Sequence, residues 1–215
     1  MLDQQKTVLG VFLEIEGAFN NTCYGTMCDV LVMHGSEYTI IRWFRANLEG
    51  RVAVANLNGF SMRLAISRGC PQGGVLSSRV WCLVVDDLLA RLSGNGVFIQ
   101  GNAEDRCLLA VGKFPNMVSG LMHWALSTLE TWWNEVKLLV NPDKTGHVAF
   151  TRKRNSWVSV NHNYFEVKLS PSRPVKYLGV ILDSRLTWRK HVDVKMRKAH
   201  NLLWACRRAC RARWA

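Results

Sequence analysis

The segment from Arg68 to Ser77 combines residue types that let a backbone approach a ligand closely. It reads Arg-Gly-Cys-Pro-Gln-Gly-Gly-Val-Leu-Ser, and its three glycines and proline disfavour both a helix interior and a central strand. Apolar residues recur at helical spacing from Val80 to Leu92, which predicts a helix of about four turns after the loop. A glycine-rich loop that opens a helix suits a phosphate or a nucleotide, because the helix N-terminus favours negative charge. An ordinary turn before a helix is the alternative interpretation.

Short apolar segments on either side of this loop predict strands. The run from Val8 to Ile15 is rich in branched residues and indicates a covered strand that ends on an acid, Glu14. Segments 52–57 and 60–66 alternate about Asn58-Gly59, a strong signal for a two-residue hairpin.

Later segments predict a second hairpin with an acidic turn. Apolar residues at 97–102 and 108–111 flank Glu104 and Asp105. Further strands are expected at 146–150 and 164–169.

Helices are predicted between these strands. Apolar periodicity indicates helices at 22–34, 37–48 and 115–136, the last opened by Pro115 and packed through tryptophans 132 and 133. Three arginines near the second helix are expected to form a solvated face, namely Arg42, Arg45 and Arg51.

Asp86 and Asp87 form an adjacent carboxylate pair on the predicted helix that follows the loop. Asp87 precedes Arg91 by four residues, so an exposed ion pair explains it better than an acid–base pair does.

The composition is that of a folded, basic protein. A length of 215 residues and a hydrophobic fraction of 48% are enough for one sizeable core. The 28 Lys and Arg exceed the 16 Asp and Glu, for a net charge of +12. This excess favours a polyanionic partner, although ribosomal and membrane-surface proteins share it. Since there is neither an apolar run long enough to span a bilayer nor a leader pattern, we expect an intracellular protein.

The seven cysteines are an odd number without close pairing. We expect them to be small buried apolar residues rather than a disulfide framework. Cys206 and Cys210 have no histidine at the usual finger spacing, which disfavours a zinc site.

The amino-acid sequence of the glycine-rich loop resembles a conserved sequence block of a known polymerase family. Residues 69–77, Gly-Cys-Pro-Gln-Gly-Gly-Val-Leu-Ser, are similar to the G-x-P-Q-G-x-x-L-S block of reverse transcriptases, in the form carried by non-LTR, LINE-like retrotransposons. In that family the block lies against the template and the incoming nucleotide, with the glutamine near the forming base pair. The resemblance implies that Gly69, Pro71, Gln72 and Gly73 bind substrate.

Residues 14–19, Glu-Ile-Glu-Gly-Ala-Phe, resemble the first palm motif of the family. That motif has an aspartate, three variable residues, an alanine and an aromatic residue, and its aspartate binds both catalytic magnesium ions. Glu14 takes the aspartate position here. Phe19 takes the aromatic position, which in the family packs under the sugar of the incoming nucleotide and disfavours a ribose 2'-hydroxyl. A solvated strand end and a core residue are the alternatives for these two residues.

The turn at Glu104-Asp105 resembles the second acidic motif, an aromatic, an alanine and two aspartates in most reverse transcriptases. Asn102 replaces the aromatic residue and Glu104 the first aspartate. The resemblance implies that Glu14, Ile15, Glu104 and Asp105 hold two Mg²⁺ ions about 4 Å apart, for which Mn²⁺ can substitute. The additional methylene of glutamate displaces a carboxylate by about 1 Å, which can cost on the order of 100-fold in rate. We therefore expect a weak or silent polymerase site.

Three later segments extend the resemblance. Residues 139–145 resemble the next family motif, which makes Lys144 the candidate general acid for the leaving pyrophosphate. Residues 175–183 match the last palm motif, a hairpin that grips the primer end, here with Leu178 and Gly179. The tail from Arg185 carries ten Lys and Arg and is expected to begin a thumb that meets nucleic-acid phosphates.

Together these motifs imply an α/β (α+β) polymerase palm, a small antiparallel sheet backed by helices on one face, with the fingers largely absent. We expect the palm at 1–183, with a partial fingers insertion at about 20–66, and the basic start of a helical thumb at 184–215. The implied function is RNA-directed DNA polymerisation by two-metal nucleotidyl transfer in retrotransposition. Its partners would be an RNA template, a DNA primer and deoxynucleoside triphosphates. We expect no membrane contact, no obligate protein partner, and a location in the nucleus or the cytoplasm.

Two rival interpretations stay open. The glutamates and the missing fingers favour a non-catalytic remnant that binds nucleic acid through its basic tail, whereas five motifs in the expected order favour polymerase ancestry. A group II intron-type or telomerase-type relative shares the fold but matches residues 69–77 and 16–19 less well.

Overall fold

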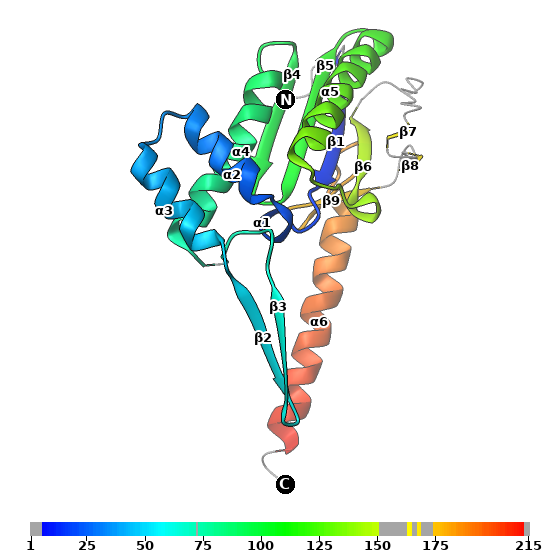
Figure 1. Ribbon diagram of the computed structural model, residues 1–215. Coiled ribbons are helices and arrows are strands. Elements are labelled where there is room, and N and C mark those ends of the chain that lie inside the picture. Colours follow the sequence, from blue (N-terminus) through cyan, green and yellow to red (C-terminus); the bar gives the residue numbers. More distant parts are fainter. Residues whose placement is uncertain (1–5, 72, 151–162, 165–166, 169–173, 213–215) are drawn as a thin grey trace.

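A four-stranded antiparallel sheet forms the centre of the computed structural model, which describes residues 6–71, 73–150, 163–164, 167–168 and 174–212. The strand order is β4-β5-β1-β6 (Figure 1). The strands are β1 (Thr7–Glu14), β4 (Val97–Asn102), β5 (Asp105–Gly112) and β6 (Gly146–Phe150). The two central strands, β1 and β5, are covered on both faces, which explains why their sequences are nearly continuous apolar runs.

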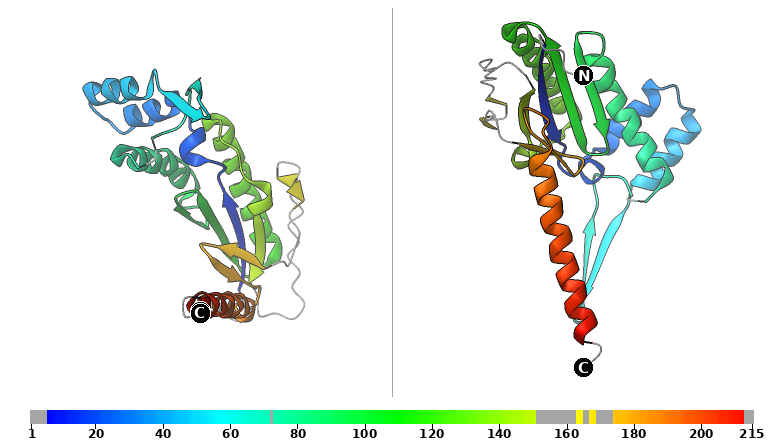
Figure 2. Two further views of the ribbon diagram at one scale, coloured as in Figure 1. Left: turned by 90° about the horizontal axis from the view of Figure 1, so that it is seen from below. Right: turned by 180° about the vertical axis from the view of Figure 1, so that it is seen from behind.

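Helices cover one face of the sheet. The two that pack on it are α4 (Val75–Leu92) and α5 (Pro115–Val136), and α2 (Tyr24–Met33) and α3 (Tyr38–Leu48) lie outside α4 (Figure 2). Trp132 and Trp133 are fully buried in this layer, as the sequence predicted. The small antiparallel sheet backed by helices is therefore confirmed.

The opposite face of the sheet carries a short hairpin, β9 (Val175–Tyr177) and β10 (Val180–Leu182). It packs on a second apolar cluster formed by Phe12, Cys107, Val148 and Phe150. Its turn is Leu178-Gly179, and both residues have positive φ.

Two elements project from the same end of the body (Figure 1). One is the hairpin of β2 (Val52–Leu57) and β3 (Phe60–Ala65), which turns at Asn58-Gly59 as predicted. The other is a long helix, α6 (Arg189–Ala212). Seen from below, the hairpin and α6 lie on opposite sides of the body, with the sheet between them (Figure 2).

Three sequence predictions need correction. The helix after the loop begins at Val75, inside the segment 68–77 that was expected to be loop, because the Pro71 carbonyl accepts hydrogen bonds from the Gly74 amide and the Ser77 hydroxyl and so closes the loop earlier. A short helix, α1 (Ala18–Asn21), was not predicted. The expected strand at 164–169 is instead two paired strands, β7 (Asn163–Tyr164) and β8 (Val167–Lys168), with residues 165, 166 and 169 outside the described part.

The cysteine prediction holds only in part. All seven are free, and Cys28, Cys70 and Cys107 are buried. Cys23 is half-buried, and the other three are exposed, namely Cys82, Cys206 and Cys210. Among the described residues, no helix combines the length and the apolar character needed to cross a membrane.

The predicted ion pair of Asp87 with Arg91 is confirmed, with the carboxylate 2.9 Å from the guanidinium. Arg91 also pairs with Glu135 of α5 at 2.8 Å, so this contact joins the two helices that back the sheet.

The glycine-rich loop is tied to the segment that follows β1. The Gly69 amide donates to the Thr22 carbonyl at 2.8 Å, and the Cys70 amide donates to the Phe19 carbonyl at 2.7 Å. Gly69 has φ +86°, and a Cβ there would lie 2.6 Å from the Asn20 carbonyl oxygen. Only glycine fits at this position without a backbone shift.

We predict that Gly69→Ala lowers the free energy of unfolding by about 3 kcal/mol, because strain and a backbone clash act together. The measurement is urea denaturation followed by circular dichroism. Gly35→Ala is the matched control, since Gly35 also has a positive φ, +69°, but open space around it; it should cost about 1 kcal/mol. Equal losses for the two variants would show that the contact with Asn20 does not matter.

Candidate active site

Two of the expected acids lie side by side at the end of the sheet. Glu14, the last residue of β1, is directly opposite Asp105, the first residue of β5, in the antiparallel register. Side chains alternate along strands, so Glu14 shares a face with Phe12, and Asp105 shares that face with Cys107. Both carboxylates therefore lie on the face that carries the β9–β10 hairpin.

Backbone hydrogen bonds fix the peptides around this pair. The Ile15 amide donates to the Glu104 carbonyl at 2.8 Å, and the Asn141 amide donates to the Glu14 carbonyl at 2.9 Å. Ile15 also bridges to Val140. The end of β1 is thus held between the acidic turn on one side and the segment before Lys144 on the other.

Lys144 contacts one member of the acid pair, Glu14. It lies in the short helical turn η1 (Pro142–Lys144), and its Nζ forms an ion pair with Glu14 Oε1. The hydrogen bond to Glu14 raises the pKa of Lys144, and the charges of Glu14, Glu104 and Asp105 act in the same direction. Lys144 is therefore fully protonated at neutral pH, as a proton donor must be.

The charges around Asp105 act in opposite directions. Burial raises the pKa of the Asp105 carboxyl, and the neighbouring Glu14 raises it further. The positive charges of Arg106 and Lys144 oppose this rise. Two carboxylates on directly opposite residues of paired strands form an arrangement expected of a cation site.

The carboxylates of Glu14 and Asp105 are ligands of the kind that a magnesium ion prefers. Mg²⁺ is usually bound through one or two carboxylates, with waters and substrate phosphates as the other ligands. Glu14 and Asp105 can supply the two carboxylates. Glu104 lies on the turn itself, and the described residues contain no group of three or more His, Cys, Asp or Glu side chains that could hold a metal. Ile15 has a fully buried apolar side chain, so only its carbonyl could serve as a ligand.

The hairpin expected to grip a primer lies on the same face of the sheet as the acid pair. Leu178 and Gly179 form the β9–β10 turn, and Tyr177 beside it packs on Phe12 with ring centres 5.2 Å apart. Phe12 is two residues before Glu14, so this hairpin and the acid pair occupy one face.

The substrate-binding residues predicted in the loop are partly described. Gly69 is buried against α1, whereas Pro71 and Gly73 are exposed; Gln72 lies outside the described residues. The sequence interpretation missed Arg51, whose Nη1 donates to the Gly69 carbonyl at 2.8 Å. Arg51 was expected on the solvated face of the preceding helix, but it is half-buried and supports the loop.

Phe19 connects the loop side of the molecule to the acidic turn. Its ring centre is 5.8 Å from that of Trp81 on α4, and Trp81 Nε1 donates to the Ala103 carbonyl at 2.8 Å. Phe19 is half-buried against the core. Trp81 carried no motif signal, and the sequence interpretation did not single it out.

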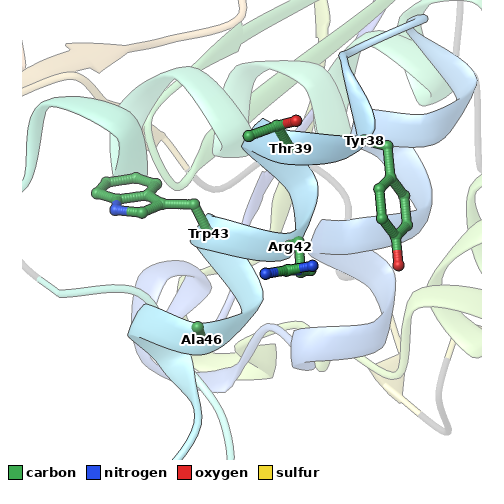
Figure 3. Close-up of a pocket in the computed structure, with 5 residues that line it drawn as sticks. All are labelled: Tyr38, Thr39, Arg42, Trp43 and Ala46. Atoms are coloured by element: carbon green, nitrogen blue, oxygen red, sulfur yellow. The ribbon is translucent and has the colours of Figure 1, made fainter.

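A separate hollow lies on the surface of α3, outside the acid site. It is lined by Tyr38, Thr39, Arg42, Trp43 and Ala46, which all belong to that one helix (Figure 3). None of the predicted site residues takes part in it.

The acid pair predicts opposite pKa changes for two substitutions. Glu14→Gln should lower the pKa of Asp105, because it removes a neighbouring negative charge. Lys144→Met should raise it, because it removes a positive charge that opposes the rise. Carboxyl carbon shifts measured by NMR across a pH titration report both. Glu135→Gln, at the exposed pair with Arg91, is the control, and changes of the same sign in the first two variants would contradict the geometry.

Comparison with known proteins agrees with the motifs. The family profile described as reverse transcriptase (RNA-dependent DNA polymerase) matches residues 1–182. A Pol polyprotein from the type-1 retrotransposable element R1 of Bradysia coprophila is 26% identical, over 98% of this chain and 21% of its own length. The RNA-directed DNA polymerase from the mobile element jockey of Drosophila melanogaster is 24% identical, over 89% of this chain and 21% of its own length.

A solved structure of telomerase from Candida tropicalis, in complex with a TWJ fragment of telomeric RNA, has a TM-score of 0.60 at 11% identity, covering 86% of this chain and 29% of the telomerase. At that identity the likeness concerns the polymerase palm fold alone. The chain spans about a fifth of the length of these two retrotransposon relatives. Since the family profile covers most of the sequence, and the relatives are non-LTR retrotransposon proteins, the chain belongs to the reverse transcriptase family.

Proposed function

We propose that this chain is the part of a reverse transcriptase that adds deoxynucleotides to a DNA primer on an RNA template, with release of pyrophosphate. The observation that carries the proposal is the cross-strand pairing of Glu14 with Asp105. This pairing places two carboxylates on the face that also bears the β9–β10 hairpin. The residues assigned to metal, proton transfer and primer thus come from four separate segments but gather at one end of the sheet.

Glu14 and Asp105 would hold Mg²⁺, with the Ile15 carbonyl and Glu104 as further oxygen donors. When bound, such ions lower the pKa of a primer 3'-hydroxyl and neutralise the triphosphate. The chain itself supplies rigidity, because both acids lie on paired strands whose backbones are hydrogen-bonded on each side.

Lys144 would donate a proton to the leaving pyrophosphate. Its ion pair with Glu14 holds the ammonium beside that carboxylate, and its raised pKa keeps it protonated until the oxygen of the leaving pyrophosphate becomes basic enough to accept the proton. Leu178 and Gly179 would contact the primer end, and the loop at Gly69, Pro71, Gln72 and Gly73 would contact the template and the nucleotide.

We further propose that the two glutamates slow this reaction. A glutamate in place of aspartate moves the carboxylate outward by one methylene, and a misplacement of about 1 Å can cost on the order of 100-fold. The two losses need not multiply, because both act on one site.

Primer extension on poly-rA/oligo-dT with Mg²⁺ or Mn²⁺ tests the proposal. We expect Glu14→Asp to raise kcat by roughly 100-fold at most and Asp105→Asn to abolish incorporation. Glu16→Asp is the matched control, because Glu16 is an exposed acid two residues from Glu14, and it should change little. Incorporation that persists in Asp105→Asn would place the activity elsewhere.

A second candidate function, binding of nucleic acid without catalysis, is favoured by the charge of α6. Apart from Asp193, the charged side chains described on this helix are basic and exposed, namely Arg189, Lys190, Lys195, Arg197, Lys198, Arg207 and Arg208. Such a helix suits phosphates, and it projects from the end of the body at which β1 ends (Figure 1). We propose it as the basic start of a thumb at 184–215, after a palm at 1–183.

The salt dependence of binding tests the role of α6. Replacing Arg207 and Arg208 with Gln should weaken binding to an RNA–DNA duplex and lower the slope of log K against log salt by roughly 1 for each lost phosphate contact. Fluorescence anisotropy at several salt concentrations measures this slope. Arg91→Gln is the control, because Arg91 is already paired with two carboxylates. A slope equal to that of the parent would remove α6 from the binding surface.

A further inference from the structure

An arginine lies buried directly behind the acid pair. Arg106 follows Asp105 on β5 and is only 1% exposed. Because side chains alternate along the strand, Arg106 lies on the helix-covered face of the sheet, opposite to the face of the two carboxylates. The motif comparison assigns it no role.

The guanidinium of Arg106 binds the backbone of the acidic turn. Its Nη1 donates to the carbonyl of Ala103 at 2.9 Å and to that of Asp105 at 2.8 Å. Trp81 Nε1 also donates to the Ala103 carbonyl, at 2.8 Å. The guanidinium carbon lies 5.5 Å from the centre of the Trp81 ring, within the range of a cation–π contact. One carbonyl at the tip is thus held by two donors from behind.

The turn needs such support. Ala103 has φ +50°, a conformation that L-residues other than glycine seldom adopt. The adjoining Glu104 carbonyl accepts the hydrogen bond from the Ile15 amide that ties the turn to β1. A rotation of the Ala103 peptide would therefore move both Glu104 and Asp105 relative to Glu14.

The neighbouring residues leave space for the guanidinium. Gly101 lies directly opposite Arg106 in the β4–β5 register, and a Cβ at Gly101 would come within 3.2 Å of Nη1. Among the described residues, the Nε and Nη2 atoms have no hydrogen-bond partner, and Arg106 forms no ion pair. Burial lowers its pKa to about 10, so it stays charged at neutral pH.

We propose that Arg106, together with Trp81, is a positioning residue for the catalytic carboxylates. A buried charge without a carboxylate partner costs stability, and the contacts it does make converge on the turn that presents Asp105. Arg106 thus acts through the backbone and does not touch the substrate. Its consequence for catalysis rests on the polymerase function proposed above, but its effect on the turn does not.

The test compares four variants of the full chain. Arg106→Met removes the guanidinium that donates to both carbonyls, whereas Arg106→Lys keeps a charge that can reach one carbonyl. Trp81→Phe keeps an aromatic ring but loses the Nε1 donor. Arg91→Met is the control, since it breaks an exposed ion pair remote from the turn. Three readouts are taken: hydrogen exchange of the peptide spanning 101–107, binding of Mn²⁺ alone by EPR, and kcat with primer–template affinity.

We expect exchange at 101–107 to become about tenfold faster in Arg106→Met and Trp81→Phe, in line with the loss of a charged or buried hydrogen bond. Arg106→Lys should restore part of the protection. Mn²⁺ binding should weaken in Arg106→Met and Trp81→Phe, and less so in Arg106→Lys. If the chain polymerises, kcat should fall by on the order of 100-fold, with primer–template affinity unchanged, a split that general loss of stability would not produce.

The outcomes separate the two proposals. Unchanged exchange at 101–107 in both Trp81→Phe and Arg106→Met overturns the positioning role, whatever the activity. If Arg106→Met fails to fold, Trp81→Phe decides the question, since it leaves the buried charge in place. If the parent binds no Mn²⁺ and extends no primer while exchange responds as expected, the polymerase proposal fails and the positioning role stands.

Discussion

The antiparallel register of β1 and β5 is the constraint on which the site depends. It sets Glu14 opposite Asp105, and strand alternation then assigns each neighbour to a face. Leu13 and Leu108 enter the core beneath the helices, while Phe12 and Cys107 meet the β9–β10 hairpin. A slip of one residue would exchange these faces and bury the acids. The same apolar packing that stabilises the sheet therefore fixes where the carboxylates lie.

Two like charges at the end of a sheet must be offset, and the chain does this from both faces. Lys144 pairs with Glu14 on the face that carries the β9–β10 hairpin, and Arg106 lies behind Asp105 on the face covered by the helices. Both cations lower the pKa of Asp105, against burial and the charge of Glu14. They differ in kind, because Lys144 is exposed and can move with a substrate, whereas Arg106 is held by carbonyl groups and an aromatic ring.

Local signals in the sequence were enough to predict most of the elements. Asn58-Gly59 defined one hairpin, and the apolar runs at β1, β4 and β5 defined the sheet, because turn chemistry and periodicity act over a few residues. Contacts between distant segments were not predictable in this way. Arg51 bonds to Gly69 and Trp81 bonds to Ala103, and nothing in the sequence around either residue indicates its partner. The prediction that the acids lie together rested only on the family resemblance. Their spacing in the sequence does not establish that β1 and β5 pair.

The two glutamates are not equivalent in this setting. Glu14 ends a strand that is paired on both sides, and its carboxylate is engaged by Lys144, so its additional methylene acts within a fixed frame. Glu104 is on the two-residue turn, where its carbonyl, not its side chain, makes the described contact to Ile15. A change of side-chain length at Glu104 leaves that contact intact, whereas the same change at Glu14 alters the spacing to both Asp105 and Lys144. The spacing of Glu14 to Asp105 and Lys144 therefore depends on the side chain at position 14, whereas position 104 ties the turn to β1 through its backbone.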